Sequence, residues 1–301
     1  MKKLRTHRKV GEKVILAIMT VFAAAASIIF LLPTVLTITN SFMAQSEINA
    51  NYGVVFSSVT GGGKTFISEK VNLKFIPDIV SFSQYYSVLF KTPDYLLKFW
   101  NSVILTVPVV IFQTVVALFA SYGFARLTGK LKEILFFFYI VLMLMPYQVT
   151  LVPNYLVAEK LGLLNTRWAI ILPGIFSPFA VFLLTKAMKR IPKTYFEAAM
   201  LDGASELQIF TNICYPMVRS AVFSVLMLVF IDYWNMVEQP LILLNDEQMH
   251  PLSIFLSKIN TGDTGLAFAV AVIYMTPSLL MFLYGEDYLV EGITYSGGIK
   301  G

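Results

Sequence analysis

Long stretches without a charged side chain constrain this sequence more than any other feature. No Asp, Glu, Lys or Arg occurs at 14–46, 99–125, 134–158, 168–185 or 264–285. A helix that spans the hydrocarbon core of a membrane needs about 20 mostly apolar residues. Only 14% of all residues are charged, against about a quarter in soluble domains. The sequence therefore predicts an all-α protein that crosses a membrane several times.

We predict six transmembrane helices, with both termini on the same side. The first occupies residues 14–43, and its apolar run continues past the alanine-rich segment Ala23–Ser27, so we expect an uncleaved helix rather than a signal peptide. Spans two to six lie within 98–285. Each of the four remaining uncharged stretches is expected to be one helix. The fifth span runs roughly from Met217 to Leu244, although Asp232 and Glu238 interrupt it.

Lysine and arginine residues indicate which ends face the cytoplasm, because cytoplasmic ends of spanning helices carry an excess of both. They gather in residues 1–13, after the second span, and in the loop 186–219 after the fourth. We therefore place residues 1–13, this loop and the tail 286–301 in the cytoplasm. The loop 44–97 is then external and is expected to hold a short amphipathic helix near Ser83–Leu89. A net charge of +5 distributed in this way fits topology better than nucleic-acid binding.

The loop after the fourth span, at 191–216, has the best-defined local signals. Pro192 suits the first turn of a helix, and residues 193–201 are good helix formers. Gly203 can end that helix in a left-handed conformation. Ser205 and Gln208 match a capping box that begins a second helix, whose apolar face would hold Ile209, Phe210 and Ile213. These signals predict a helix–glycine–helix elbow.

The spacing of this elbow leaves two interpretations open. One is an ordinary amphipathic elbow on the membrane surface, and the other is a docking element for another protein. Asp202 lies at the end of the first helix, where the helix dipole disfavours an anion. It is therefore expected either to cap the following turn or to meet a basic partner.

No catalytic, cofactor-binding or metal-binding motif is visible in the sequence. Gly61–Thr65 resembles a phosphate-binding loop, but Ser58 stands where that motif requires glycine. The single cysteine, Cys214, excludes an intrachain disulfide. The two histidines, His7 and His250, are far apart in the sequence, which disfavours a histidine-based metal site.

An ionisable residue within a span is a candidate functional residue. Asp232, Tyr233, Trp234, Asn235 and Gln239 give the fifth span a polar and aromatic patch. Aromatic faces stack on the C–H edges of sugars, while amides and carboxylates bind sugar hydroxyls, so this patch is a candidate substrate path. Alternatively, Asp232 forms a hydrogen bond to another helix, and Trp234 anchors at the membrane interface.

The segment Glu197-Ala198-Ala199-Met200-Leu201-Asp202-Gly203-Ala204, followed by Phe210, Ile213 and Pro216, resembles the EAA loop of ABC importer permeases. Tyr215 stands before Pro216 where the family usually has leucine. Gly162–Thr166, Trp234-Asn235 and the segments 291–294 and 298–301 are similar to the carbohydrate-uptake subgroup, the maltose-type second permease. The resemblance covers most of the chain outside 44–97.

This resemblance implies the type I ABC importer permease fold in a bacterial plasma membrane. A second permease subunit, expected to be a different chain, would complete the pore. Two cytoplasmic ATP-binding subunits would drive it, and an extracellular solute-binding protein would deliver a sugar or oligosaccharide. The elbow would be the coupling helix that docks on the ATPase, through Glu197, Ala198, Ala199, Asp202 and Gly203. Glu197 would offer a carboxylate, the alanines would allow close approach, and Gly203 would supply the bend.

Two alternatives within transport remain open. The solute could be something other than a sugar. The chain could also be a self-sufficient secondary transporter, which would need ion-coupling carboxylates in several spans or inverted repeats. An intramembrane enzyme would need a catalytic pair or a metal motif at membrane depth.

Overall fold

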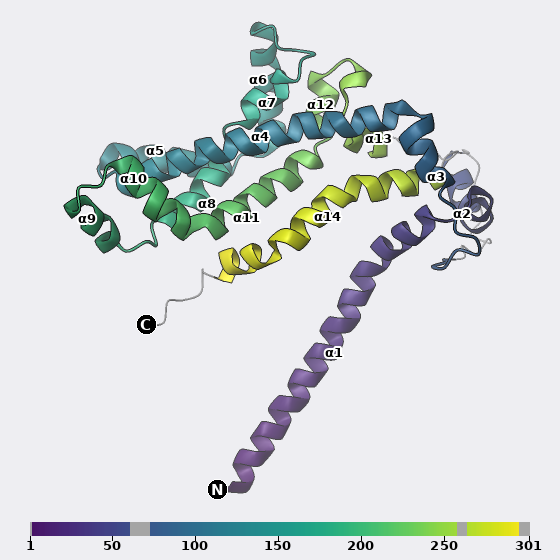
Figure 1. Ribbon diagram of the computed structural model, residues 1–301, viewed down its shortest axis with the longest axis horizontal. Helices are drawn as coiled ribbons and strands as arrows, with labels where there is room; N and C mark the ends of the chain where they lie inside the picture. Colours follow the sequence, from purple (N-terminus) through teal and green to yellow (C-terminus); the bar gives the residue numbers. More distant parts are fainter. Residues whose placement is uncertain (1, 61–72, 258–263, 295–301) are drawn as a thin grey trace. The chain divides into compact units, whose positions relative to one another are not determined.

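The computed structural model describes residues 2–60, 73–257 and 264–294 (Figure 1). Within these residues the regular elements are helices, apart from one antiparallel bridge between Met43 and Val80, so the all-α prediction is confirmed. The segments Gly61–Thr65 and 298–301 lie outside the described residues. The chain divides into two units, residues 1–92 with 259–273 and residues 93–258 with 274–301.

The described part of the chain contains five segments that are long and apolar enough to cross a membrane. A sixth is present if one bent pair of helices counts as a single span. This makes the protein a multi-pass membrane protein. The five segments are Gly11–Ser41, Pro93–Arg126, Trp168–Met188, Glu206–Trp234 and Gly265–Tyr288.

The bent pair corrects the prediction of one helix at 134–158. The structure has α5 (Lys130–Met143) and α6 (Tyr147–Lys160), which meet at 102°. Pro146 causes the break, because proline lacks a backbone N–H and disfavours a helical conformation in the residue before it. Its ψ of 140° is that of extended backbone.

The fourth span is also interrupted. It consists of α7 (Trp168–Gly174) and α8 (Pro178–Met188). Ser177 begins the second piece, since its hydroxyl accepts a hydrogen bond from the Ala180 backbone N–H at 3.3 Å. Pro178 occupies the first helical turn, where its missing N–H has no cost.

The fifth span differs from the predicted 217–244 at both ends. The chain is helical from Glu206 to Trp234 through α10 (Glu206–Ile209), the π-helix η2 (Phe210–Cys214) and α11 (Tyr215–Trp234). The π-turn lies just before Pro216, where the regular hydrogen-bond pattern must change because proline donates no N–H. After Trp234 the helix ends, and α12 (Glu238–Leu243) is separate. The second helix of the elbow is therefore the first part of this span.

Helix α4 (Pro93–Arg126) is the centre of the second unit. It starts inside the segment predicted as the loop 44–97, with Pro93 in its first position. It packs against α7, α8, α11 and α13 (Leu252–Ser257), and Figure 1 shows α8 and α11 running along it. Two buried serines join it to its neighbours. The Ser121 hydroxyl donates to the Val181 carbonyl, and the Ser102 hydroxyl accepts from the Leu252 N–H, both at 2.9 Å.

Residues 274–288 of α14 (Thr264–Thr294) contact α11 at a few points, and the closest approach is at Gly285. A Cβ atom at Gly285 would lie 2.0 Å from the Phe223 ring and 2.8 Å from the Met227 sulfur. Glycine is therefore required for this approach of the two helices.

The first unit contains α1 (Lys2–Ser41), α2 (Gln45–Thr60), α3 (Ser83–Tyr86) and the π-helix η1 (Ser87–Lys91). The last two confirm the predicted short helix near Ser83–Leu89. Helix α2 was not predicted, because its sequence has few large apolar residues with helical spacing. Its inner face holds Ile48 and Tyr52, which pack with Met43 and with Phe268 of α14.

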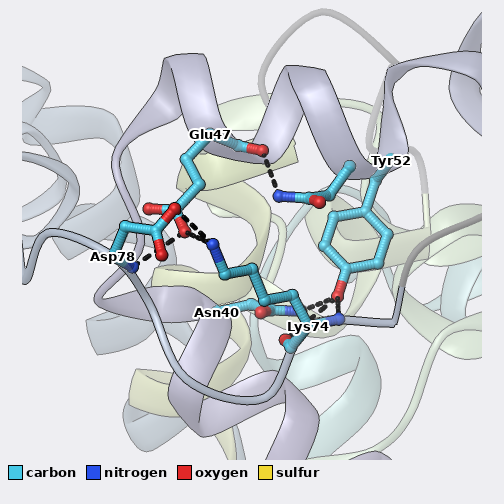
Figure 2. A network of polar contacts seen from close by, with 6 residues as sticks. Asn40, Glu47, Tyr52, Lys74 and Asp78 are labelled. Atoms are coloured by element: carbon cyan, nitrogen blue, oxygen red, sulfur yellow. Dashed lines mark hydrogen bonds and ion pairs between the residues drawn. The ribbon is translucent and has the colours of Figure 1, made fainter.

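Side chains of α1 and α2 hold the irregular segment around Lys74 in place (Figure 2). The Lys74 ammonium forms ion pairs with Glu47, at 2.9 Å, and with Asp78. Glu47 also accepts the Asp78 backbone N–H at 2.9 Å. The Tyr52 hydroxyl accepts from Asn40 at 3.0 Å and from the Lys74 backbone N–H at 3.1 Å. We call these five residues the Lys74 clamp.

Within the Lys74 clamp, the pKa of Glu47 is lowered and the pKa of Lys74 is raised. The Asp78 N–H, followed by the Lys74 ammonium, holds the pKa of Glu47 below its ordinary 4.5. The carboxylates of Asp78 and Glu47 raise the pKa of Lys74 above its ordinary 10.5. Glu47 thus stabilises the segment at neutral pH, and this contribution is lost as the pH falls through its lowered folded-state pKa. The Lys74 contribution is lost as the pH rises through its raised pKa.

We expect the backbone amide of Asp78 to lose hydrogen-exchange protection when the pH falls below the lowered pKa of Glu47. Glu47→Gln should reduce protection at neutral pH and remove this acid-side transition. Asp94→Asn, which removes an ion-paired carboxylate in α4, is the matched control and should leave the profile unchanged. An acid transition that survives in Glu47→Gln would show that Glu47 is not its cause.

Candidate functional site

The elbow begins with helix α9 (Lys193–Leu201). Pro192 stands immediately before this helix in extended conformation, with ψ of 136°, rather than within its first turn. Phe196 and Ala199 are buried and join the core cluster that also contains Ile191 and Met188. One side of α9 thus packs on its own chain.

A glycine turn ends α9 as its sequence predicted. Gly203 has a φ of 81°, in the left-handed region. Its N–H donates to the Met200 carbonyl at 3.1 Å, and the Ala204 N–H donates to the Ala199 carbonyl at 3.0 Å. This pair of bonds is the Schellman arrangement, which satisfies the last carbonyls of a helix.

The predicted capping box begins α10 directly after the turn. The Ser205 hydroxyl accepts the Gln208 N–H at 3.4 Å, and the Gln208 side chain accepts the Ser205 N–H at 2.8 Å. Ile209 and Phe210 are buried, as the predicted apolar face requires. The turn between the two helices is therefore fixed by local hydrogen bonds at both ends.

The residues of the elbow that were singled out from the sequence fall into two groups. Glu197, Ala198, Asp202 and Gly203 are exposed, whereas Ala199 is only 9% exposed and faces its own core. The structure adds two apolar residues to the exposed group. Leu201 is 89% exposed and Leu207 64% exposed, although both are long aliphatic side chains. The sequence signal that indicates these two exposed leucines is their position on the polar side of the elbow.

Two side chains of α4, Arg126 and Tyr122, contact both helices of the elbow, and we call this pair the brace. The Arg126 guanidinium donates to the Glu206 carboxylate at 2.9 Å and lies over the Phe196 ring, 4.7 Å from its centroid. The same group reaches the Met200 sulfur at 3.7 Å. Tyr122 of α4 donates a hydrogen bond to Glu206. Sequence reasoning missed these contacts because they join residues 70 to 84 positions apart.

The second candidate set lies at the other end of α11. Trp234 is 2% exposed, and its ring stacks between those of Phe230 and Tyr274 at 5.3 and 5.7 Å. Its indole N–H donates to the Tyr274 carbonyl at 2.9 Å, and the Tyr274 hydroxyl donates to the Trp234 carbonyl at 2.9 Å. Trp234 therefore connects α11 with α14 and presents no open face.

The neighbours of Trp234 differ in exposure. Tyr233 is partly buried, and its hydroxyl would lie 2.9 Å from a Cβ atom at Gly174. The Asn235 amide bonds the Ile231 carbonyl at 2.7 Å and accepts from Tyr274 at 2.8 Å. Asp232 is exposed, and no described residue forms a hydrogen bond or an ion pair with it.

Gln239 lies on α12, outside the helix that carries the other four residues, and is partly buried. The structure thus brings Tyr233, Trp234 and Asn235 into packing contacts at the end of α11. It leaves the Asp232 carboxylate exposed. The predicted hydrogen bond from Asp232 to another helix is not present within the described part of the chain.

The brace yields a testable expectation. Arg126→Met keeps most of the side-chain volume but removes the charge that holds Glu206. Because the pair is partly exposed, its loss should cost below about 1 kcal/mol of global stability. The amides of 193–209 should nevertheless exchange hydrogen faster, which mass spectrometry of peptides can measure. Lys130→Met, at an exposed cation four residues later, should change neither quantity. Equal hydrogen exchange at 193–209 in Arg126→Met and Lys130→Met would contradict the role of Arg126 in holding the elbow.

The part of the chain that carries these features matches a known protein family. Residues 113–286 match the family described as "Binding-protein-dependent transport system inner membrane component". This range includes the elbow and all of α11.

Two curated relatives cover most of the chain. The arabinooligosaccharides transport system permease protein AraQ of Bacillus subtilis (strain 168) is 27% identical over 94% of this chain and 95% of its own. The lactose transport system permease protein LacG of Rhizobium radiobacter is 30% identical over 70% of this chain and 78% of its own.

A solved structure shares the fold. It belongs to a bacterial ABC transporter involved in the import of the acidic polysaccharide alginate. The TM-score is 0.74, the identity is 20%, and the match covers 92% of this chain and 97% of the other.

Proposed function

Because the chain belongs to the family of binding-protein-dependent transport system inner membrane components, we propose that it is a permease subunit of an ATP-driven ABC importer. It forms half of the translocation pore for a sugar or oligosaccharide in a bacterial plasma membrane. The family match over 113–286 carries this proposal. A sugar as the solute is supported by the names of two relatives, which are permease proteins of transport systems for arabinooligosaccharides and for lactose.

In this proposal the elbow faces the cytoplasm and docks on an ATP-binding subunit, and the chain itself hydrolyses no ATP. The distribution of lysine and arginine supports this orientation. The exposed side of the elbow carries an apolar residue, Leu201, between the carboxylates of Glu197 and Asp202. Burial of Leu201 against a partner would contribute about 2 kcal/mol to docking.

The continuous helix from Glu206 to Trp234 is the proposed route from the elbow to the pore. It contains 29 residues, which corresponds to about 43 Å at the rise of an α-helix. The brace from Arg126 makes α4 follow the same displacement. Coupling requires only that each state of the ATPase bind one state of the permease better than the other.

Asp232 is the proposed polar contact in the substrate path. A carboxylate in contact with lipid is costly, by as much as about 2.5–3.5 kcal/mol at the centre of a membrane on insertion scales. An exposed Asp232 without a described bonding partner is therefore better explained by an aqueous path between two permease subunits than by lipid. Trp234 and Asn235 hold the end of α11 in position, and the buried Trp234 ring offers no face on which a solute could stack.

The proposal includes an external solute-binding protein and a second, different permease chain. The family description names dependence on a binding protein. The alternative is that the same site carries a solute other than a sugar. Uptake assays with labelled sugars and labelled non-sugar solutes distinguish these two possibilities.

The coupling role of the elbow predicts the behaviour of Gly203→Val. A β-branched residue at a φ of 81° is strained by more than the roughly 1–2 kcal/mol that a simple L-residue pays. We expect loss of uptake while the protein still inserts into the membrane and assembles with its partners. Uptake of labelled sugar in vesicles measures this.

The matched control is Gly123→Ala, at a glycine with ordinary helical backbone and no atom closer than 4.0 Å to the added Cβ. It should transport normally. Normal transport in Gly203→Val as well would remove the coupling role of the elbow.

The substrate-path role predicts that Asp232→Ala lowers uptake efficiency about tenfold, the effect of one lost hydrogen bond to a charged group. Subunit assembly should be unchanged. Asp287→Ala removes an exposed carboxylate from α14 and is expected to transport like the unmodified protein. If the kcat and KM of uptake are the same in Asp232→Ala as in the unmodified protein, the Asp232 carboxylate does not contact the solute.

A further inference from the structure

A hollow of about 530 Å³ lies between α4 and the start of α7, and none of the residues of the two candidate sites lines it. One side is formed by Ile104, Pro108 and Phe112 of α4. The other includes Asn165, Arg167 and Trp168. We call this hollow the Arg167 groove.

Arg167 provides a positive charge that no acidic residue in the described part of the chain pairs with. Its Nη2 donates to the Asn101 side-chain oxygen at 2.9 Å. Its Nε is buried without a hydrogen-bond partner among the described residues. None of the ion pairs in the described ranges involves Arg167. A guanidinium has five N–H donors, so most of its bonding capacity remains available.

The guanidinium is nevertheless held in place. Asn101 is only 2% exposed. Its amide nitrogen donates to the backbone carbonyls of Gln248 and His250. Asn165, on the other side of Arg167, accepts the backbone N–H groups of Asn245 and Asp246 at 3.0 and 2.9 Å. The loop 245–250 therefore holds Asn165, in the turn that presents Arg167, and also Asn101 of α4, which accepts from the guanidinium.

The remainder of the groove is apolar and elongated. Ile104, Pro108 and Phe112 are spaced by four residues and thus lie along one face of α4. From Ile104 to Phe112 this row extends about 12 Å along the helix axis. Ile104 and Phe112 are 41% and 50% exposed. These side chains offer no hydrogen-bonding group to a sugar.

The position of the groove in the sequence matches a membrane boundary. Arg167 directly precedes the uncharged stretch 168–185. Trp168 is 54% exposed, and tryptophan is enriched where membrane meets water. The charged end of the groove therefore lies at headgroup depth, while its apolar row extends into the hydrocarbon.

We propose that the Arg167 groove binds one anionic phospholipid. The headgroup phosphate accepts hydrogen bonds from the Arg167 guanidinium, and one acyl chain lies along Ile104, Pro108 and Phe112. A phosphate matches the donor geometry of arginine and supplies the missing counter-charge. The apolar row distinguishes this ligand from a free phosphate or an acidic sugar, neither of which would use it.

Native mass spectrometry of the transporter assembled with its partner subunits tests the proposal, with phosphatidylglycerol and phosphatidylcholine as probes. We expect Arg167→Gln to bind phosphatidylglycerol about fivefold more weakly at one site, the effect of one cation near an anionic headgroup. Lys160→Gln, which removes an exposed cation seven residues earlier, should bind like the unmodified protein. Ile104→Trp fills the apolar part without changing the charge and should weaken binding of both lipids.

Three results would overturn the proposal. One is equal phosphatidylglycerol binding by Arg167→Gln and the unmodified protein at every lipid concentration. Another is displacement of phosphatidylglycerol by inorganic phosphate or by an oligogalacturonate, which would indicate a site for a soluble anion. The third is loss of subunit assembly in both Arg167→Gln and Ile104→Trp with lipid binding unchanged, which would make the groove a subunit interface.

Discussion

A backbone N–H or carbonyl inside a bilayer finds no water, so each must be satisfied within the protein. This requirement explains how the chain can interrupt its helices. The break before α8 uses the Ser177 hydroxyl as a cap. The elbow uses the Gly203 and Ala204 N–H groups to close α9, and Ser205 to open α10. At these breaks, local side chains or turns replace part of the lost helical bonding.

The elbow is covalently continuous with a membrane span. Because the second elbow helix continues into α11, the elbow cannot move without its span. Arg126 adds a lateral link to α4 through Glu206 and Phe196. Near the middle of α11, Gly285 allows α14 to pack directly on Phe223. Three long helices are thus joined to one short exposed segment, which is the link that the proposed coupling from the elbow to the region of Asp232 requires.

The sequence predicts the glycine turn and the capping box of the elbow, but it predicts none of the long-range contacts. Gly203 and the Ser205–Gln208 box determine their own hydrogen bonds within a few residues, so their conformation could be predicted. Pro146 is also local, but its effect was missed because hydropathy alone treats 134–158 as one apolar run. The burial of Trp234 depends on Tyr274, 40 residues later, and sequence spacing does not show that these two will meet.

The reciprocal bonds between Trp234 and Tyr274 also bear on how the protein is made. During synthesis, α11 enters the membrane before residue 274 exists, so its indole N–H has no protein acceptor at that stage. The donor is satisfied only when the last helix arrives, and the same event satisfies the tyrosine hydroxyl. Insertion of α14 is therefore required before these two donors can pair, and a nascent chain stalled before it would lack both hydrogen bonds.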